Sequence, residues 1–191
     1  MWRQKMTMAE TEPSAGPTTL RVEHPQAMHE LGVRLGNRLR AGDLVVLTGP
    51  LGAGKTTLSR GIGEGLGVRG PVTSPTFVLA RTHPSTVGGP PLVHVDAYRL
   101  TDASELDDLD IDFDASVVLM EWGAGLVQPG ESWIEVTIER PTGAALAAPP
   151  PGGGDSSIAQ SGSDALFEDE MVEPRIVTIA GYGRRWVEGV L

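Results

Sequence analysis

The chain of 191 residues contains no cysteine. Disulfide bonds, thiolate zinc sites, iron–sulfur clusters and cysteine nucleophiles are therefore excluded. Aromatic residues make up only 5% of the chain, and its apolar runs extend over a few residues, far short of the roughly 20 that a membrane-spanning helix needs. The first seven residues also lack the apolar core of a signal peptide. We therefore expect a cytoplasmic protein with no membrane partner.

Lysine is scarce as well, because Lys5 and Lys55 are the only two in the chain. The formal net charge is −10. This charge argues against broad electrostatic binding of nucleic acid by the chain alone. The charge is unevenly distributed, since residues 18–100 carry nine basic and five acidic residues, whereas residues 101–191 carry four and eighteen. The first half of the chain is therefore the half suited to an anionic ligand.

Composition divides the chain into one domain and two polar segments. Residues 1–17 are polar and without period, which predicts a disordered leader. Residues 141–173 are rich in Ala, Pro, Gly, Ser and acidic residues and poor in large apolar ones, which predicts a solvated, low-complexity insertion. The remainder of residues 18–191 is long and apolar enough for a single domain with one sizeable core.

Hydrophobic periodicity predicts alternating strands and helices. The expected strands cover residues 20–22, 44–47, 77–80, 92–95, 117–120, 133–139 and 175–180, and the expected helices run from Pro25 to Gly42 and from Lys55 to Gly67. This alternation is typical of an α/β fold with a mixed, mainly parallel central sheet. We expect the last two strands to pair antiparallel at an edge of that sheet.

A phosphate-binding loop lies between the second expected strand and the second expected helix. Its sequence, Gly49-Pro50-Leu51-Gly52-Ala53-Gly54-Lys55-Thr56, fits the pattern G-x-x-x-x-G-K-[ST]. In such a loop, backbone N–H groups surround the phosphates, the lysine reaches the β- and γ-phosphates and the hydroxyl ligates Mg²⁺. We therefore expect nucleotide binding by Gly49, Leu51, Gly52, Ala53, Gly54, Lys55, Thr56 and Thr57.

Two acidic residues stand at the carboxyl ends of expected strands, where a nucleotide-hydrolysing site of an α/β sheet needs them. Asp96 follows residues 92–95, and Glu121 follows residues 117–120. We predict that both serve catalysis and the metal, although each is also compatible with a helix cap or turn. His94 is interpreted as a strand side chain, because the four histidines show no zinc spacing.

A turn rich in hydroxyl groups, Thr73, Ser74, Pro75 and Thr76, joins the second helix to the next strand. Its hydroxyl groups are placed to approach a γ-phosphate as a switch. An ordinary Ser/Thr/Pro turn has the same composition, so the residues alone leave both interpretations open.

The expected nucleotide is ATP. A GTPase carries an Asn-Lys-x-Asp motif that recognises guanine and an Asp-x-x-Gly switch motif. In this sequence the only asparagine, Asn37, precedes an arginine, and no Asp-x-x-Gly motif occurs. A stand-alone small-molecule kinase is the main alternative, but it normally has an arginine-rich lid and the only long insertion here is acidic. An ATP-sensing module that does not hydrolyse ATP is the third possibility.

The sequence resembles the TsaE (YjeE-like) ATPases of bacterial tRNA threonylcarbamoyladenosine (t6A) biosynthesis. The resemblance covers roughly residues 18–140, with a weaker similarity over residues 175–186. It rests on ordered blocks: Leu31-Gly32, residues 42–47, residues 51–56, Arg60-Gly61, Leu66-Gly67, residues 72–77 (Val-Thr-Ser-Pro-Thr-Phe), residues 94–100 (His-Val-Asp-Ala-Tyr-Arg-Leu) and Met120-Glu121-Trp122.

The resemblance implies a P-loop NTPase-like three-layer sandwich. It implies that Lys55 and Thr56 bind ATP and Mg²⁺, that Asp96 and Glu121 serve the metal and hydrolysis, and that residues 73–76 act as a switch. It also implies that the protein works with the TsaB–TsaD complex, which attaches threonylcarbamoyl to adenosine 37 of tRNAs. Hydrolysis of ATP would keep that complex turning over, and tRNA would be reached only through the complex.

The sequence departs from the family pattern at four places. Pro50 stands where the family often has Asp, Asp110 replaces a glycine, and an aromatic residue is replaced near Thr82-His83. We expect the first change to alter loop stiffness without altering the phosphate contacts, and the other two to bear on contacts with a partner or the base. The insertion at residues 141–173 is also foreign to the short family pattern.

Overall fold

The computed structural model describes residues 12–75, 79–100, 104–123, 132–141 and 173–191. Most of the expected leader and insertion lies outside these residues. Thr76 of the expected switch and Phe77, the expected start of a strand, lie outside them too. In the part of the chain that the structure describes, no helix is long and apolar enough to cross a membrane.

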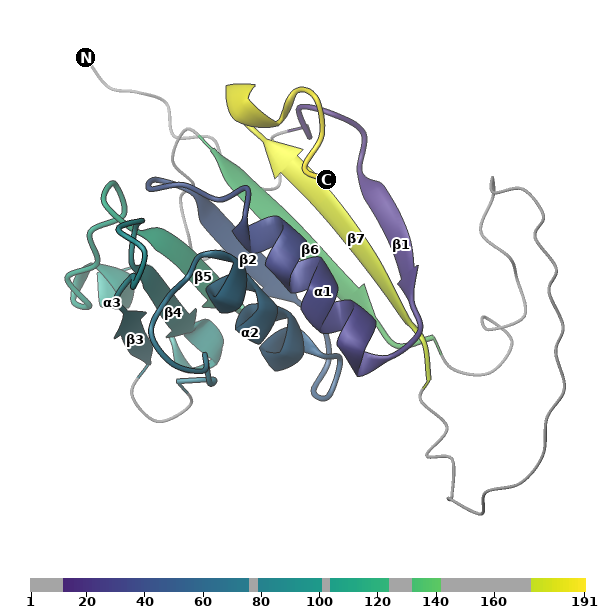
Figure 1. The fold of residues 1–191 in the computed structure, drawn as a ribbon, viewed down its shortest axis with the longest axis horizontal. Coiled ribbons are helices and arrows are strands. Elements are labelled where there is room, and N and C mark those ends of the chain that lie inside the picture. The colour runs from purple at the N-terminus through teal and green to yellow at the C-terminus, as the bar shows by residue number, and fades with distance from the viewer. Residues whose placement is uncertain (1–11, 76–78, 101–103, 124–131, 142–172) are drawn as a thin grey trace, which may run out of the picture.

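The described residues form one seven-stranded sheet in the order β1-β7-β6-β2-β5-β4-β3 (Figure 1). Strands β6, β2, β5 and β4 are parallel neighbours, β7 and β3 run antiparallel to them, and β1 is antiparallel to β7. The mixed, mainly parallel sheet is therefore confirmed. The strands are β1 (Thr18–Val22), β2 (Leu44–Thr48), β3 (Ala80–His83), β4 (Leu92–Asp96), β5 (Val117–Glu121), β6 (Trp133–Glu139) and β7 (Arg175–Tyr182).

Two helices, α1 (Pro25–Gly36) and α2 (Lys55–Gly65), lie side by side over one face of the sheet (Figure 1). Their backbones touch, because a Cβ atom on Gly32 would lie 2.3 Å from the carbonyl oxygen of Leu58, and one on Gly61 would lie 2.1 Å from that of His29. Only glycine permits an approach this close. The described residues also contain the short helix α3 (Ser104–Asp107) and the 3₁₀ helices η2 (Ala97–Arg99) and η4 (Arg184–Trp186).

Alternation along the strands produces a core on each face of the sheet. Val45 and Leu47 of β2 pack with α1 and α2, whereas Leu44 and Val46 pack on the opposite face with Leu100 and Leu106 of the η2–α3 region. A strand buried on both faces has no polar side to expose. This arrangement explains the uninterrupted apolar run of β2 and gives the expected three layers.

Several boundaries differ from the sequence-based expectations. The first helix ends at Gly36, because Arg38 and Leu39 form the hydrogen bonds of a turn instead of continuing the helix. The third strand was expected over residues 77–80, of which Phe77 and Val78 lie outside the described residues. The described strand spans Ala80–His83 and begins after Leu79, whose φ of +58° is not that of an extended strand. Strands β4 and β5 extend by one residue to include Asp96 and Glu121.

Strands β6 and β7 pair antiparallel as expected, but they do not form the edge. Strand β1 pairs with β7, from Thr18 opposite Ile179 to Val22 opposite Arg175, and occupies the edge instead. The chain before β1 also contacts β7, because the Ser14 N–H donates to the Gly181 carbonyl at 2.8 Å. Local alternation identified β1 as a strand but contained no information about its distant partner.

Candidate nucleotide-binding site

The phosphate loop connects β2 to α2 and depends on glycine backbone conformations. Gly49, Gly52 and Gly54 have φ values of +157°, +74° and +107°. A Cβ atom on Gly49 would also lie 2.6 Å from the carbonyl oxygen of Ile138 in β6. The loop leads directly into the amino-terminal end of α2, where backbone N–H groups and the helix dipole favour an anion. The local geometry therefore agrees with the sequence motif.

The other predicted loop residues differ in exposure. Leu51 is 90% exposed, so its contribution to an anion site is limited to its backbone. Ala53 is buried, and Thr56 and Thr57 in the first turn of α2 are half-buried. The two threonine side chains are thus positioned at the helix end beside the loop.

Lys55 is the first residue of α2, and its side chain turns back into the loop. Its Nζ atom donates hydrogen bonds to the carbonyl oxygens of Gly49 at 2.8 Å and Pro50 at 3.1 Å. It also lies 4.0 Å from the centroid of the Trp122 ring. Burial lowers the pKa of Lys55, and the negative charges of Glu121 and Asp96 partly oppose that effect. The lysine and both predicted acids therefore belong to one electrostatic environment.

Asp96 and Glu121 are direct neighbours at the carboxyl ends of β4 and β5, where the parallel register pairs them. Leu92 and Leu119, an even number of residues earlier on the same strands, pack in the core beneath α1 and α2. Because side chains alternate along a strand, both acids are on the face that carries the phosphate loop helix. The two carboxylates are only 9% and 4% exposed. The fold therefore brings together the acids that the sequence analysis selected.

Each acid also has a local structural contact. Asp96 Oδ1 accepts a hydrogen bond from the Tyr98 N–H at 3.2 Å and caps η2, so the helix-cap interpretation is correct for this contact. Glu121 Oε1 lies 3.0 Å from Nε2 of His94, whose side chain is fully buried. This bond fixes one carboxylate oxygen of Glu121.

The donor set fits Mg²⁺. That ion prefers oxygen ligands and is usually held by one or two carboxylates together with phosphate oxygens and water. Thr56, Asp96 and Glu121 offer a hydroxyl and two carboxylates. Among the described residues there is no cluster of three or more His, Cys, Asp or Glu side chains that would form a metal site by itself.

The predicted switch is described only in part. Thr73 and Ser74 are half-buried and Pro75 is buried. The Thr73 hydroxyl accepts a hydrogen bond from Arg81 Nη1 in β3 at 3.1 Å. The contact with β3 ties this segment to the sheet edge beside β4, and the switch role stays a prediction.

Sequence reasoning did not include Trp122 among the site residues. Trp122 follows Glu121 directly and has a φ of +63°, which is uncommon for a residue with a large side chain. Its ring lies beneath Lys55 and meets the exposed Tyr98 ring edge to face, with centroids 5.8 Å apart. The sequence offered two signals, its position after a strand-terminal acid and its place in the Met120-Glu121-Trp122 block of the resemblance. Nothing in the local sequence indicates the backbone conformation.

Comparison with known proteins identifies the family of this chain. The family model described as "Threonylcarbamoyl adenosine biosynthesis protein TsaE" matches residues 22–145. The chain belongs to the TsaE family. Its TsaE relatives include a protein of Streptomyces coelicolor named "tRNA threonylcarbamoyladenosine biosynthesis protein TsaE", which is 50% identical over 163 residues covering 83% of this chain and 93% of the relative.

Two further TsaE proteins with the same printed name are similar over shorter stretches. The protein of Mycobacterium tuberculosis is 54% identical over 120 residues, or 58% of this chain and 71% of the relative. The protein of Bacillus subtilis is 45% identical over 84 residues, or 44% and 52%. A solved structure, "Crystal structure of Bacillus subtilus YdiB", has a TM-score of 0.57 and 24% identity, and covers 89% of this chain and 88% of that chain. This structural similarity confirms the P-loop NTPase-like fold.

Proposed function

We propose that the protein is a Mg²⁺-dependent ATPase that acts in threonylcarbamoyl modification of tRNA. One observation carries the proposal: Lys55 of the phosphate loop is under the electrostatic influence of Asp96 and Glu121, which end neighbouring parallel strands. Phosphoryl transfer depends mainly on positioning and on stabilising charge. A lysine, a helix end and two buried carboxylates at one edge of a sheet supply these requirements.

Each residue has a definite task in this mechanism. The loop N–H groups and Lys55 bind the phosphate oxygens, and Thr56, Asp96 and Glu121 would hold Mg²⁺, which neutralises phosphate charge when bound. Glu121 orients the attacking water and accepts its proton. His94 restrains one oxygen of that carboxylate at 3.0 Å, which limits the orientations that the acid can adopt.

The proposed partner is the TsaB–TsaD complex, with tRNA reached only through it and with the cytoplasm as the location. The names of the relatives support a role in t6A biosynthesis. The net charge of −10 disfavours independent binding to tRNA. Tyr98, which contacts the Trp122 ring, is 73% exposed, so a large apolar side chain beside the site faces solvent. We therefore propose that turnover is slow in the isolated protein and that the partner completes the site.

The test is phosphate release from MgATP, measured with and without the TsaB–TsaD complex, alongside repeated rounds of t6A formation. Our proposal expects slow release alone and faster release with the complex. Transfer of the γ-phosphate to a small metabolite without protein partners would establish the kinase alternative. ATP binding with no phosphate release under either condition would establish the sensor alternative. Equal t6A turnover with wild-type and Glu121→Gln protein would contradict the assigned role.

A further inference from the structure

A polar cavity lies at the end of the sheet opposite the phosphate loop. It has a volume of about 540 Å³, and its described lining residues are Ser132, Gly183, Arg184 and Arg185. Ser132 precedes β6, and the two arginines belong to η4 beyond β7. Asp43, which is hydrogen-bonded to Ser132, precedes β2, whereas Gly49 of the phosphate loop follows that strand. An extended chain as long as β2 spans roughly 20 Å, so the cavity is distinct from the nucleotide-binding site.

The guanidinium group of Arg185 is held in place by three contacts. Its Nη1 atom donates to Oδ2 of Asp43, and its Nη2 atom donates to the carbonyl oxygen of Arg38. Its Cζ atom lies 4.5 Å from the centroid of the Trp186 ring. A guanidinium group has five N–H donors, so further donors remain after these contacts. Because the group is already immobilised, binding a ligand through them costs little side-chain entropy.

The carboxylate of Asp43 is buried and its oxygens are occupied. Asp43 is only 3% exposed. Its Oδ1 atom accepts a hydrogen bond from the Ser132 hydroxyl at 2.9 Å, and its Oδ2 atom accepts one from the Arg40 N–H at 2.8 Å in addition to that from Arg185. The single negative charge of Asp43 is therefore matched by Arg185, and none of it is left to balance other arginines.

Three further arginines of this region have no counter-charge. Arg38, Arg40 and Arg184 are exposed, and none of them forms an ion pair with a described residue. Residues 38–43 and 183–191 together have four arginines and two acidic residues, Asp43 and Glu188, in a chain whose net charge is −10. This local excess of positive charge attracts anions.

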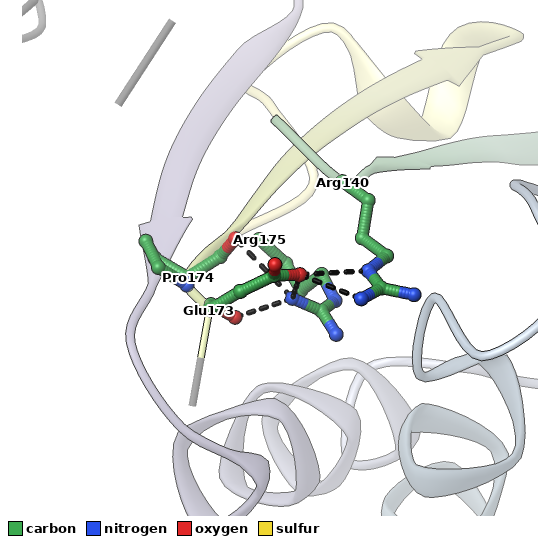
Figure 2. A network of polar contacts seen from close by, with 4 residues as sticks. All are labelled: Arg140, Glu173, Pro174 and Arg175. Atoms are coloured by element: carbon green, nitrogen blue, oxygen red, sulfur yellow. Dashed lines mark hydrogen bonds and ion pairs between the residues drawn. The ribbon is translucent and has the colours of Figure 1, made fainter. Parts of the chain in front are cut away.

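The other end of the β6–β7 pair also carries arginines, but there they are neutralised. Figure 2 shows Arg140, just after β6, beside Glu173 and Arg175 at the start of β7. Glu173 Oε2 accepts hydrogen bonds from Arg140 Nε at 2.9 Å and Nη2 at 2.7 Å, and it lies 3.8 Å from Arg175 Nη1. Arg184 has no such acid among the described residues. An unbalanced arginine therefore distinguishes the cavity end of these strands.

The charges and the lining of the cavity indicate which anion it suits. A carboxylate carries one negative charge, whereas a phosphate monoester is close to a dianion and presents three acceptor oxygens to the two guanidinium groups of Arg184 and Arg185. The described lining residues have no apolar side chain, so they offer little surface to an aromatic base or an acyl chain. A cavity of this size is typical of sites for small organic ligands. A small, polar phosphate ester satisfies all three conditions.

We propose that this cavity is a second anion site, which binds a small phosphate monoester of the sugar-phosphate class through the guanidinium groups of Arg184 and Arg185. Asp43 and Trp186 are positioning residues, because they hold Arg185 without lining the cavity. The exposed charges of Arg38 and Arg40 add attraction at longer range. The site shares no residue with the phosphate loop, so the inference goes beyond the proposed ATPase function and does not depend on it.

The experiment follows the NMR signal of the Trp186 indole N–H, which donates to Ser132 Oγ at 2.8 Å beside the cavity. The probes are inorganic phosphate and ribose 5-phosphate, each titrated with and without saturating MgADP. We expect a saturable shift with both probes, tighter binding of ribose 5-phosphate, and no competition from MgADP. Sodium chloride and sodium acetate at equal ionic strength should produce no saturable shift. Competition from MgADP would place the bound phosphate in the phosphate loop and overturn the proposal.

Variants of Arg184 test the site directly. Arg184→Ala should weaken binding of both probes roughly 10-fold or more, as expected for a lost hydrogen bond between charged groups. It should fold normally, because the Arg184 side chain has no partner among the described residues, whereas Arg185→Ala would leave Asp43 buried without its counter-charge. Arg60→Ala, which removes another exposed arginine, is the matched control and should bind both probes like the wild type.

Three results would overturn the proposal. The first is equal affinity of wild-type and Arg184→Ala protein for ribose 5-phosphate. The second is a saturable shift of the same size with acetate, which would assign the cavity to carboxylates. The third is binding of a short RNA oligonucleotide without terminal phosphates in the absence of ribose 5-phosphate binding, which would assign the arginines to an RNA backbone.

Discussion

Lys55 Nζ lies 4.0 Å from the centroid of the Trp122 ring, so the cation of the phosphate loop contacts the residue that follows the strand-terminal acid. A cation over an indole face is stabilised by about 0.5–2 kcal/mol, with the larger values at desolvated sites. Lys55 is only 6% exposed. The contact links the loop to the end of β5 and offsets part of the backbone strain at Trp122.

The Lys55→Ala variant should lose most ATP affinity. No second lysine is available to replace its charge at the phosphates, and the loss of a charged hydrogen-bond donor is expected to cost roughly 100-fold in affinity. Arg60→Ala, which changes an exposed cation on the same helix, should bind normally. The measurement is calorimetric titration with MgATP, and near-normal affinity in folded Lys55→Ala protein would refute the phosphate-loop assignment.

The Asp96→Ala and Glu121→Gln variants should bind ATP but lose ~10²-fold or more in hydrolysis with the partner complex present. Glutamine is the better substitution at position 121, because its side-chain oxygen can still accept from His94, which alanine would leave buried and unpaired. Single-turnover phosphate release measures the effect. A residue whose variant hydrolyses ATP at the wild-type rate would have a structural role only.

The Gly61→Ala variant should be strongly destabilised. A methyl group there would lie 2.1 Å from the His29 carbonyl oxygen, so α1 and α2 must move apart. Overpacking of this kind typically costs about 1–3 kcal/mol or more of unfolding free energy. Gly16→Ala is the control, because no atom lies within 4 Å of the added group. Urea denaturation compares the two, and equal midpoints would contradict the close helix contact.

Ionisation of Tyr182 should lower the free energy of unfolding at alkaline pH. Burial, followed by the charge of Glu135 and the hydrogen bond to it, raises the pKa of Tyr182 above 10.0. The folded state therefore retains the phenolic proton to higher pH than the unfolded state does. The contribution of Tyr182 to the free energy of unfolding is complete below pH 10 and is lost as pH rises through the pKa of the folded state. Unfolding free energies of wild-type and Tyr182→Phe proteins should therefore converge as pH rises above 10, and a constant difference would contradict the assignment.

The sequence was sufficient for features governed by local pattern. The phosphate loop has a distinctive spacing, and Asp96 and Glu121 could be selected because an acid after a buried parallel strand must appear at the carboxyl edge of the sheet. Their adjacency required the strand order, which brings β4 beside β5. Local residues influence whether a strand forms, but its neighbour depends on packing throughout the domain.

The features that were missed depend on contacts between distant residues or on backbone strain. Glu173 and Arg140 are 33 positions apart and meet only because β6 and β7 pair. The edge position of β1 depends on the same pairing with β7. The positive φ of Trp122 is imposed by its surroundings, since its side chain alone disfavours that conformation.

The Arg140–Glu173 ion pair also bears on how this chain can vary in length. Strands β6 and β7 pair from Trp133 opposite Tyr182 to Glu139 opposite Ile176. This pairing and the ion pair hold the two ends of the connection between the strands in fixed positions. Closing a loop costs only ~0.6 kcal/mol more for each doubling of its length. The connection between β6 and β7 can therefore become longer or shorter at small cost in stability, because the paired strand ends stay in place.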